Sequence, residues 1–299
     1  MAELTGGLAM SHGPQLMVRP EQWDVLHNRQ GKTLPVRPEL ASETLEEKSA
    51  KWRRCMQAID HLRRKLEAWK PDVLVIVADD QHENITDNAN PPFTIFIGES
   101  CEASVSLSYF NEPKSANRTR YKAHQELAQE LLENLMDAGF DPAYAKDLPY
   151  EGGLGHAFAR VLKFLTPDAG LPVVPIMVNT YFPPAPSSKR CVAFGRGLAA
   201  AIRQAAGNRK VAIIGSGGLS HTLIDEALDH GVLAAIKSND LGYLGALPAA
   251  SLTAGTSEIR NWIVTAAAAD RPATVVEYIP LYRTPTGVGC GMGFAYWDG

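Results

Sequence analysis

The sequence has few cysteines, and they show no arrangement typical of a metal module or a disulfide framework. Its four cysteines, Cys55, Cys101, Cys191 and Cys290, are widely separated, and no CxxC pair is present. Cysteine-based zinc modules and small disulfide-stapled secreted domains are therefore disfavoured. We expect free thiols in a cytoplasmic protein.

Long apolar runs and an excess of positive charge are also missing. No uninterrupted apolar run approaches the roughly 18–20 residues that a membrane span needs. The N-terminal stretch MAELTGGLAMSHGP lacks the charged start and long apolar segment of a signal peptide. The formal net charge of -4 provides no basic field for a nucleic acid. We expect neither a membrane nor a nucleic-acid partner, and we expect a homo-oligomer, dimeric or larger.

The composition is that of a folded domain with a sizeable core, because 45% of the 299 residues are hydrophobic and 21% are charged. Short β-type runs alternate with helical patterns, which predicts one α/β domain over residues 1–299, with a central mixed sheet flanked by helices and the active site at the strand carboxyl ends. The expected strands cover residues 73–78, 93–97, 173–178 and 211–214, and the expected helices cover 42–69, 120–138, 196–206 and 257–269. Residues 13–40 are expected to form an irregular ordered loop, and 282–299 a final strand with a loop.

Three apolar runs each end close to a histidine. VLVIVADDQH places His82 just past a strand, VAIIGSGGLSH places His221 past another, and TGGLAMSHGP places His12 after a probable first strand. Parallel strands deliver the residues that follow them to one edge of a sheet, so these three histidines are predicted to converge there. A single histidine is more often structural than a ligand, but three at strand ends favour a site. His27, His61, His124 and His230 are expected at the surface.

Glu258 is the candidate carboxylate. In AGTSEIRNWIV, Thr256 or Ser257 can cap the helix that follows, which places Glu258 in its first turn. A carboxylate there is also favoured by the helix dipole alone. The pattern therefore permits either a metal ligand or a glutamate that only compensates the dipole.

Two histidines and one carboxylate suit Fe(II), because they hold the metal on one face and leave other positions open for substrate and O2. His12, His82 and Glu258 would form such a set. Zinc also accepts two histidines and a glutamate. The HExxH pattern of zinc hydrolases is absent, however, because Thr86 stands where its second histidine would fall.

With these residues in place, the chain resembles the class III extradiol ring-cleavage dioxygenases of the protocatechuate 4,5-dioxygenase catalytic-subunit type, and most closely the gallate and 3-O-methylgallate branch. The matching pieces span nearly the whole chain: SHGP at 11–14, PDVLVIVADDQH at 71–82, PIMVNTYFPPAPSSKRC at 175–191, GSGGLSH at 215–221 and SEIRNW at 257–262. The resemblance implies a non-haem Fe(II) enzyme that opens a catechol-type ring with O2. It implies that His12, His82 and Glu258 bind the iron and that His221 is the acid/base.

The chain departs from this family in its middle. Many members carry an HGxxxP segment whose histidine faces the substrate, whereas this chain reads EGGLGHAF, with Glu151 at that position and His156 five residues later. His156 is the candidate to take over part of that role, or it packs under the site. The remaining candidate substrate contacts are Tyr181, Arg283 and Thr286; Arg283 would pair a substrate carboxylate or be an ordinary surface arginine.

Two other functions stay open at this point. A metal-free or zinc-bound relative of the same fold would act as a binding protein or hydrolase, because fold does not fix function. A nucleotide-binding module would rest only on GSGG at 215–218, which lacks the Lys-Ser/Thr of a phosphate loop. No segment resembles the small helical subunit that some family members carry.

Overall fold

The computed structural model describes residues 1–26 and 34–299. Four parallel strands form the middle of its main sheet, in the order β1 (Glu3–Met10), β8 (Lys210–Ser216), β2 (Val73–Asp79) and β7 (Val173–Val178). Each of the last three is bonded on both sides and almost wholly buried, as the apolar runs predict.

Antiparallel strands extend the sheet on both sides. β11 (Val288–Asp298) pairs with β1, and β10 (Thr274–Tyr282) and the short β9 (His221–Leu223) pair with β11. On the other side β3 (Phe93–Phe96) runs antiparallel to β7 and parallel to β6 (Ala143–Ala145). The sheet is therefore mixed, as expected. A separate hairpin consists of β4 (Ser100–Ser104) and β5 (Arg118–Lys122).

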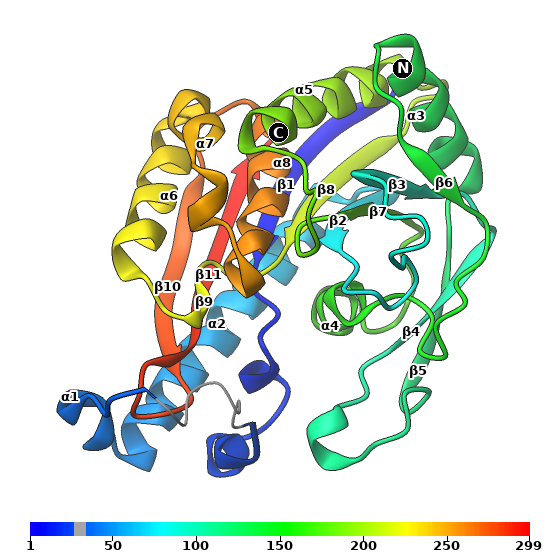
Figure 1. Ribbon diagram of the computed structural model, residues 1–299. Helices are drawn as coiled ribbons and strands as arrows, with labels where there is room; N and C mark the ends of the chain where they lie inside the picture. The colour runs from blue at the N-terminus through cyan, green and yellow to red at the C-terminus, as the bar shows by residue number, and fades with distance from the viewer. Residues whose placement is uncertain (27–33) are drawn as a thin grey trace.

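Helices cover both faces of this sheet (Figure 1). One face packs against α3 (Gln125–Asp137), α5 (Ser188–Gln204), α6 (Glu226–Ser238), α7 (Leu241–Ala246) and α8 (Ile259–Ala269). The other face packs against α2 (Leu45–Trp69) and α4 (His156–Leu165). Side chains of strand β2 alternate between the two helix layers. Val75 and Val77 pack in the core on the α5 and α8 side, and Leu74 and Ile76 pack in the core on the α2 and α4 side. The expected fold, an α/β sheet flanked by helices, is confirmed.

Several helix boundaries differ from the sequence expectation, and local caps explain the differences. The helix expected from residue 120 begins at Gln125, where the His124 side chain accepts the amide of Leu127, and the preceding residues form β5 instead. The helix expected over 196–206 begins earlier, at Ser188, because Ser187 caps it. Helix α2 begins after a capping box of Thr44 and Glu47.

The segment expected as an irregular loop contains short helices: η1 (Pro14–Leu16), η2 (Pro20–Leu26) and α1 (Pro38–Ala41). The expectations for residues 27–33, His27 among them, lie outside the described residues. Further 3-10 turns include η4 (Ser108–Phe110) and η5 (Ala249–Ser251). The expected final strand is β11, whereas β10 was not expected. Among the residues described, no helix is both long and apolar enough to cross a membrane.

Candidate metal-binding active site

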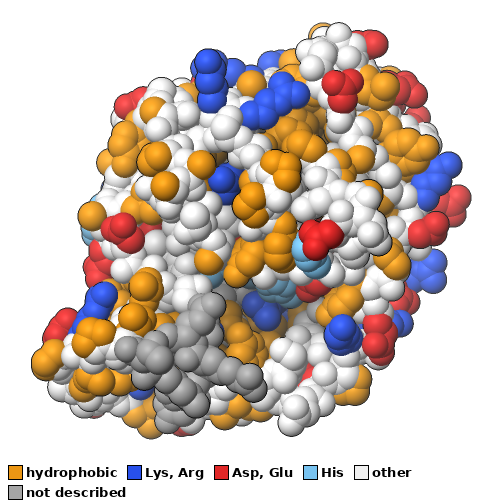
Figure 2. Space-filling model, viewed as in Figure 1, with side chains coloured by type: hydrophobic (Ala, Val, Ile, Leu, Met, Phe, Trp, Pro, Cys, Tyr) orange, Lys and Arg blue, Asp and Glu red, His pale blue; other side chains and the backbone are white. Residues whose placement is uncertain are grey.

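A cavity of about 540 Å³ opens at the carboxyl ends of the central strands. A volume of this size suits a small organic ligand. Its walls include the four histidines His12, His82, His156 and His221, together with Glu258. Figure 2 shows histidine and basic side chains at a hollow in this face of the molecule. All five residues that carry the predicted chemistry thus lie around one space.

His12 follows β1 and is held with one ring nitrogen free. Its Nδ1 lies 3.0 Å from the Ser216 hydroxyl, which itself donates to the carbonyl of Ala157 at 2.6 Å. The hydroxyl proton is thereby committed to Ala157, so His12 is the donor and its Nε2 keeps a lone pair. Burial lowers the pKa of His12 to about 3, although Glu258 opposes the shift, so the imidazole is neutral at physiological pH. A neutral imidazole with its other nitrogen anchored is a ready metal ligand.

Glu258 ends the 3-10 turn η6 (Ala254–Glu258) that leads into α8, and only 1% of it is exposed. Its Oε2 accepts the Gly218 amide at 2.8 Å and lies 3.8 Å from Nε2 of His12. Its Oε1 lies 3.3 Å from Nε2 of His221. Burial raises the pKa of this carboxyl, but His221 and His12 outweigh burial and bring it to about 2. Glu258 is therefore an anion that faces two imidazoles.

Asp79 is a buried acidic residue beside Glu258, and the sequence analysis did not identify it. It is the last residue of β2 and is fully buried. Gln81 donates from its amide to Oδ2 of Asp79 at 2.9 Å and to Oε1 of Glu258 at 3.2 Å, so it bridges the two carboxylates. Oδ1 of Asp79 has no hydrogen-bond partner among the described residues. Burial, followed by the charge of Glu258, raises the pKa of Asp79 to about 7.

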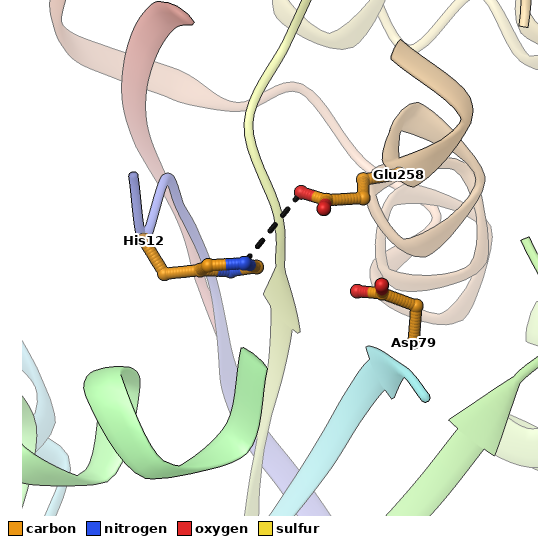
Figure 3. A group of neighbouring side chains, drawn as sticks. All are labelled: His12, Asp79 and Glu258. Carbon is orange, nitrogen blue, oxygen red and sulfur yellow. Dashed lines mark ion pairs between the residues drawn. The ribbon is translucent and has the colours of Figure 1, made fainter. Parts of the chain in front are cut away.

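His12, Asp79 and Glu258 point toward a common space, and each places one ligand atom within 4.8 Å of the others (Figure 3). Two observations indicate that this group fits a cation. A free imidazole lone pair and an unpartnered carboxylate oxygen are buried together, where leaving a polar atom unsatisfied is costly. A divalent metal would also offset the electrostatic repulsion between the carboxylates of Asp79 and Glu258.

His82 lines the same cavity but lies outside that group. Its backbone is in the left-handed region (φ 59°), and its ring stacks on Phe182 with a centroid distance of 3.4 Å. Its Nε2 lies 3.2 Å from the carboxylate of exposed Asp87, but it forms no hydrogen bond and is buried without a partner among the described residues. The metal-ligand role of His82 therefore stays a prediction.

His221 stands beside the ligand group on β9. Its Nδ1 donates to the carbonyl of Leu219 at 3.0 Å, which leaves Nε2 directed at Glu258. Burial lowers the pKa of His221, but the Glu258 carboxylate more than compensates, and the net shift is upward. The chain passes close on its other side, because a Cβ on Gly255 would lie 2.0 Å from the His221 ring. This imidazole is positioned to hold or release a proton next to the carboxylate.

His156 is the first residue of α4 and also faces the cavity. Glu83 accepts its backbone amide and lies 3.0 Å from its Nδ1, and the His156 ring meets the His12 ring edge-on at a centroid distance of 5.2 Å. Burial lowers the pKa of His156, whereas Glu83 raises it, with a net upward shift. Sequence reasoning missed Glu83, whose partner lies far along the chain.

The other expected contacts divide into two groups. Tyr181 and Arg283 line the cavity, and so does Arg160, which no sequence motif indicates. Thr286 does not: its hydroxyl pairs with that of Thr284 at 2.7 Å, and it is absent from the cavity wall. Glu151, which occupies the position of the family's substrate-facing histidine, is exposed and accepts the hydroxyl of Ser115.

A comparison with known families bears directly on this geometry. Residues 33–293 match the sequence profile of the family described as the catalytic LigB subunit of aromatic ring-opening dioxygenase. The chain belongs to this family. The match covers most of the residues discussed above, from β2 to β11, but does not reach His12. The narrower gallate branch is not distinguished by it.

Individual relatives are more distant. The chain is 27% identical over 166 residues to a 2,3-dihydroxyphenylpropionate/2,3-dihydroxicinnamic acid 1,2-dioxygenase of Klebsiella pneumoniae subsp. pneumoniae, covering 55% of this chain and 48% of the relative. It is 30% identical over 162 residues to such an enzyme of Pseudomonas putida, covering 53% and 46%. The chain thus spans about half the length of the curated relatives it matches. An uncharacterized protein, JW3007, from Escherichia coli K12 shares the fold, with a TM-score of 0.54 and 18% identity over 98% of this chain and 99% of that one.

Proposed function

We propose that this protein is an Fe(II)-dependent extradiol dioxygenase that opens the ring of a catechol-type substrate with O2. The observation that carries the proposal is the buried pair of His12 and Glu258 at the cavity wall, with His221 3.3 Å from the same carboxylate. The pair provides ligands for a metal, and His221 provides a proton acceptor beside it. Membership of the aromatic ring-opening dioxygenase family supports this interpretation.

The residues present fit a resident metal. His12 would bind through Nε2 and Glu258 through a carboxylate oxygen, with His82, as the sequence predicts, or another residue as the third ligand. When bound, Fe(II) would lower the pKa of a phenolic hydroxyl and offer open positions to the diol and to O2. Buried neutral imidazole and ionised carboxylate are the protonation states that metal binding requires.

His221 would be the residue that accepts a proton from the substrate and later donates it. Its Nδ1–H is engaged with Leu219, so Nε2 is the nitrogen that takes a proton from a substrate hydroxyl. The resulting imidazolium is stabilised by Glu258, whose carboxylate raises the pKa of His221. The same nitrogen then returns the proton to an oxygen of the opening ring. His221 therefore needs no contact with the metal to act.

Two buried arginines favour a substrate with a carboxylate. Arg160 and Arg283 both line the cavity, and the positive charge of Arg283 acts on Arg160. Their NH1 groups donate to backbone carbonyls of His12 and Leu26. The Nε atoms of both are buried without a partner, and no carboxylate of the described residues lies within ion-pair distance of either guanidinium. An anionic substituent on the catechol would form charge-assisted hydrogen bonds with these guanidinium groups.

This interpretation leaves the substrate within a class of carboxylated catechols: protocatechuate, gallate, 3-O-methylgallate and 2,3-dihydroxyphenylpropionate. The relatives reported above act on the last of these according to their names. Tyr181 and His156 would contact the ring or its substituents from the cavity wall. Thr286 does not line the cavity, so we do not propose it as a substrate contact.

Three expectations about the whole protein belong to this proposal. They are a homo-oligomeric assembly, a cytoplasmic location and a single catalytic domain over residues 1–299. Light scattering of the purified protein would test the first, and fractionation of cells that express it would test the second. Limited proteolysis would test the third, because a one-domain protein should yield no stable internal fragments.

The deciding experiment is anaerobic reconstitution with Fe(II), followed by O2 uptake with catechol and with the four carboxylated catechols. We expect stoichiometric O2 consumption with at least one carboxylated catechol and ring-opened product by mass spectrometry. The same protein loaded with Zn(II) should consume no O2. Iron-loaded protein that consumes no O2 with any of the five compounds would contradict the proposal.

A further inference from the structure

We propose that Asp229 and Thr256 are positioning residues that hold the imidazole of His221 in place at the cavity. Neither side chain lines the cavity, so neither is a candidate to touch a substrate. Each instead bonds the short segment that ends in His221. The inference rests on the proposed function, because it assigns both residues to the acid/base of that reaction.

The segment that carries His221 has little support from regular structure. β8 ends at Ser216, and the chain then turns into β9, which has three residues and pairs with β11 alone among the described strands. Gly217 and Gly218 in this turn have no side chains that could fix it. A reactive ring at the start of such a strand is placed precisely only if neighbouring groups hold the turn before it.

Asp229 fixes the residue before His221. It lies on α6 and is fully buried. Its Oδ1 accepts the backbone amide of Ser220 at 2.7 Å, and its Oδ2 accepts the Ser220 hydroxyl at 2.8 Å. Oδ2 also accepts the hydroxyl of Tyr278 at 2.7 Å, from β10, against which α6 packs (Figure 1). An ionised carboxylate accepts all three bonds, so it ties the turn to both α6 and β10.

The surroundings of this carboxylate leave room for it and complete the bonds of Ser220. A Cβ on Gly291 would lie 2.2 Å from Oδ2 of Asp229, so the absence of a side chain there lets β11 pass. The Gly291 amide donates to the Ser220 carbonyl at 2.8 Å, and the Asp225 amide donates to the Ser220 hydroxyl at 2.7 Å. A buried carboxylate is costly, and here its bonds are concentrated on the turn that leads into His221.

Thr256 fixes His221 itself. Its hydroxyl accepts the His221 amide at 3.0 Å and donates to the His221 carbonyl at 2.9 Å, so it engages both backbone groups of one residue. The hydroxyl therefore does not cap the following helix, a role that the sequence allowed for it. Thr256 belongs to η6, the turn that ends in Glu258, so it also fixes His221 relative to that carboxylate.

The direction of the ring depends on both contacts. Nδ1 of His221 donates to the carbonyl of Leu219, two residues earlier, so the ring follows the backbone of residues 219–221. Asp229 holds this backbone at Ser220 and Thr256 holds it at His221. Loss of either contact frees the ring to turn its Nε2 away from the cavity. A misplacement of about 1 Å in a catalytic group costs about 10²-fold in rate.

The kinetic test uses two matched pairs, each loaded with Fe(II). Thr256→Val removes the hydroxyl and keeps the shape, whereas Thr256→Ser keeps the hydroxyl. Asp229→Asn replaces one acceptor oxygen with a donor, whereas Tyr278→Phe removes a bond to the same carboxylate but none to Ser220. We expect Thr256→Val and Asp229→Asn to lose about 10²-fold in kcat, with KM changed by less than about threefold and metal content unchanged. Thr256→Ser and Tyr278→Phe should stay within about threefold of the wild type in kcat.

Nitrogen NMR of the histidine rings gives a readout that does not depend on activity. It is recorded on isotope-labelled protein with and without diamagnetic Zn(II), and the His221 signals are those absent from His221→Ala. With the ring neutral, we expect one tautomer, protonated at Nδ1, in the wild type, Thr256→Ser and Tyr278→Phe. We expect a mixture of both tautomers in Thr256→Val and Asp229→Asn.

The outcomes separate positioning from packing. A wild-type tautomer and kcat in Thr256→Val, or equal losses in Asp229→Asn and Tyr278→Phe, would overturn the proposal. If Asp229→Asn does not fold, Ser220→Ala replaces it, because it removes the hydroxyl bond to Asp229 from the other side and should show the same changes to a smaller degree. A wild-type protein that consumes no O2 would refute the proposed function, and the NMR comparison would still decide whether Asp229 and Thr256 hold the ring.

Discussion

Nε2 of His221 lies 3.3 Å from Oε1 of Glu258, whereas His12 faces the other oxygen of this carboxylate, Oε2. His221 therefore shares a carboxylate with the candidate metal group without belonging to it. We expect His221→Ala to retain metal and to lose about 10²–10⁴-fold in turnover, the usual contribution of general acid–base catalysis. Elemental analysis and steady-state kinetics check both parts, and metal loss would make His221 a ligand.

Gly255 provides a second test of His221 that leaves the histidine in place. A Cβ at Gly255 would lie 2.0 Å from the ring, so Gly255→Ala must displace it. A shift of about 1 Å in a catalytic group can cost about 10²-fold in rate. We expect kcat to fall by that order while the metal content stays at the wild-type value.

The matched control is Gly245→Ala, in α7. A Cβ there would make an ordinary contact, at 3.5 Å from the Val192 side chain. Both variants introduce the same methyl group, so a comparable loss of rate in both would show that Gly255 does not act through His221.

The four thiols supply a prediction about pH. Burial raises the pKa of Cys55, Cys101 and Cys191 to about 12 and that of Cys290 well above its usual value. A pKa of about 12 leaves only about 10⁻⁴ of a thiol as the reactive thiolate at pH 8. We expect no alkylation of the folded protein at pH 8 and four alkylated cysteines after unfolding, counted by mass spectrometry. Rapid labelling of any cysteine in the folded protein would contradict this burial.

Arg283 is the variant of choice for the proposed carboxylate contact, because Arg160 also supports the backbone of His12. A hydrogen bond to a charged group contributes about 1.5–3 kcal/mol, which corresponds to about 10–100-fold. We expect Arg283→Gln to raise KM by that factor for protocatechuate and to leave catechol unaffected. The exposed Arg54→Gln is the control. An equal effect on both substrates would argue against a carboxylate contact.

The sequence predicted the centre of the fold well, because the buried parallel strands are nearly continuous apolar runs. It predicted the edges poorly. β10 was not expected: its sequence, TVVEYIPLY, contains Pro280, which argues against a central strand but is tolerated at the sheet edge where β10 lies. Strand order itself depends on pairings between distant segments, and a single sequence does not encode these in any local pattern.

The same division applies to the site. Strand-end histidines could be found because a strand delivers whatever follows it to one edge, and His12 and His221 both lie at the cavity. Asp79 was missed because the strand was expected to end at residue 78, which placed the carboxylate in the loop. In the structure the strand continues by one residue to Asp79, and the carboxylate is buried there. The pairing of Glu83 with His156 joins two loops that no periodicity connects.

His156 carries the last prediction. It begins α4, so it has a packing role, and it lines the cavity, so it is available to a substrate. Glu83 holds its Nδ1 and its backbone amide, which leaves Nε2 as the atom that would reach a ring substituent. We expect His156→Gln to change the ranking of kcat/KM among gallate, 3-O-methylgallate and protocatechuate, because these differ in the substituent that would be contacted.

Stability separates this role from packing. A substrate contact should leave the Tm within about 2 °C of the wild type, the shift that about 1 kcal/mol produces in a protein of this size. A packing residue should instead lower Tm further and slow all three substrates by the same factor. Glu83→Gln keeps the His156 ring but weakens its anchor, so it should alter the same ranking in the same direction and to a smaller degree. Uniform slowing together with a clear loss of Tm in His156→Gln would assign His156 to the helix start alone.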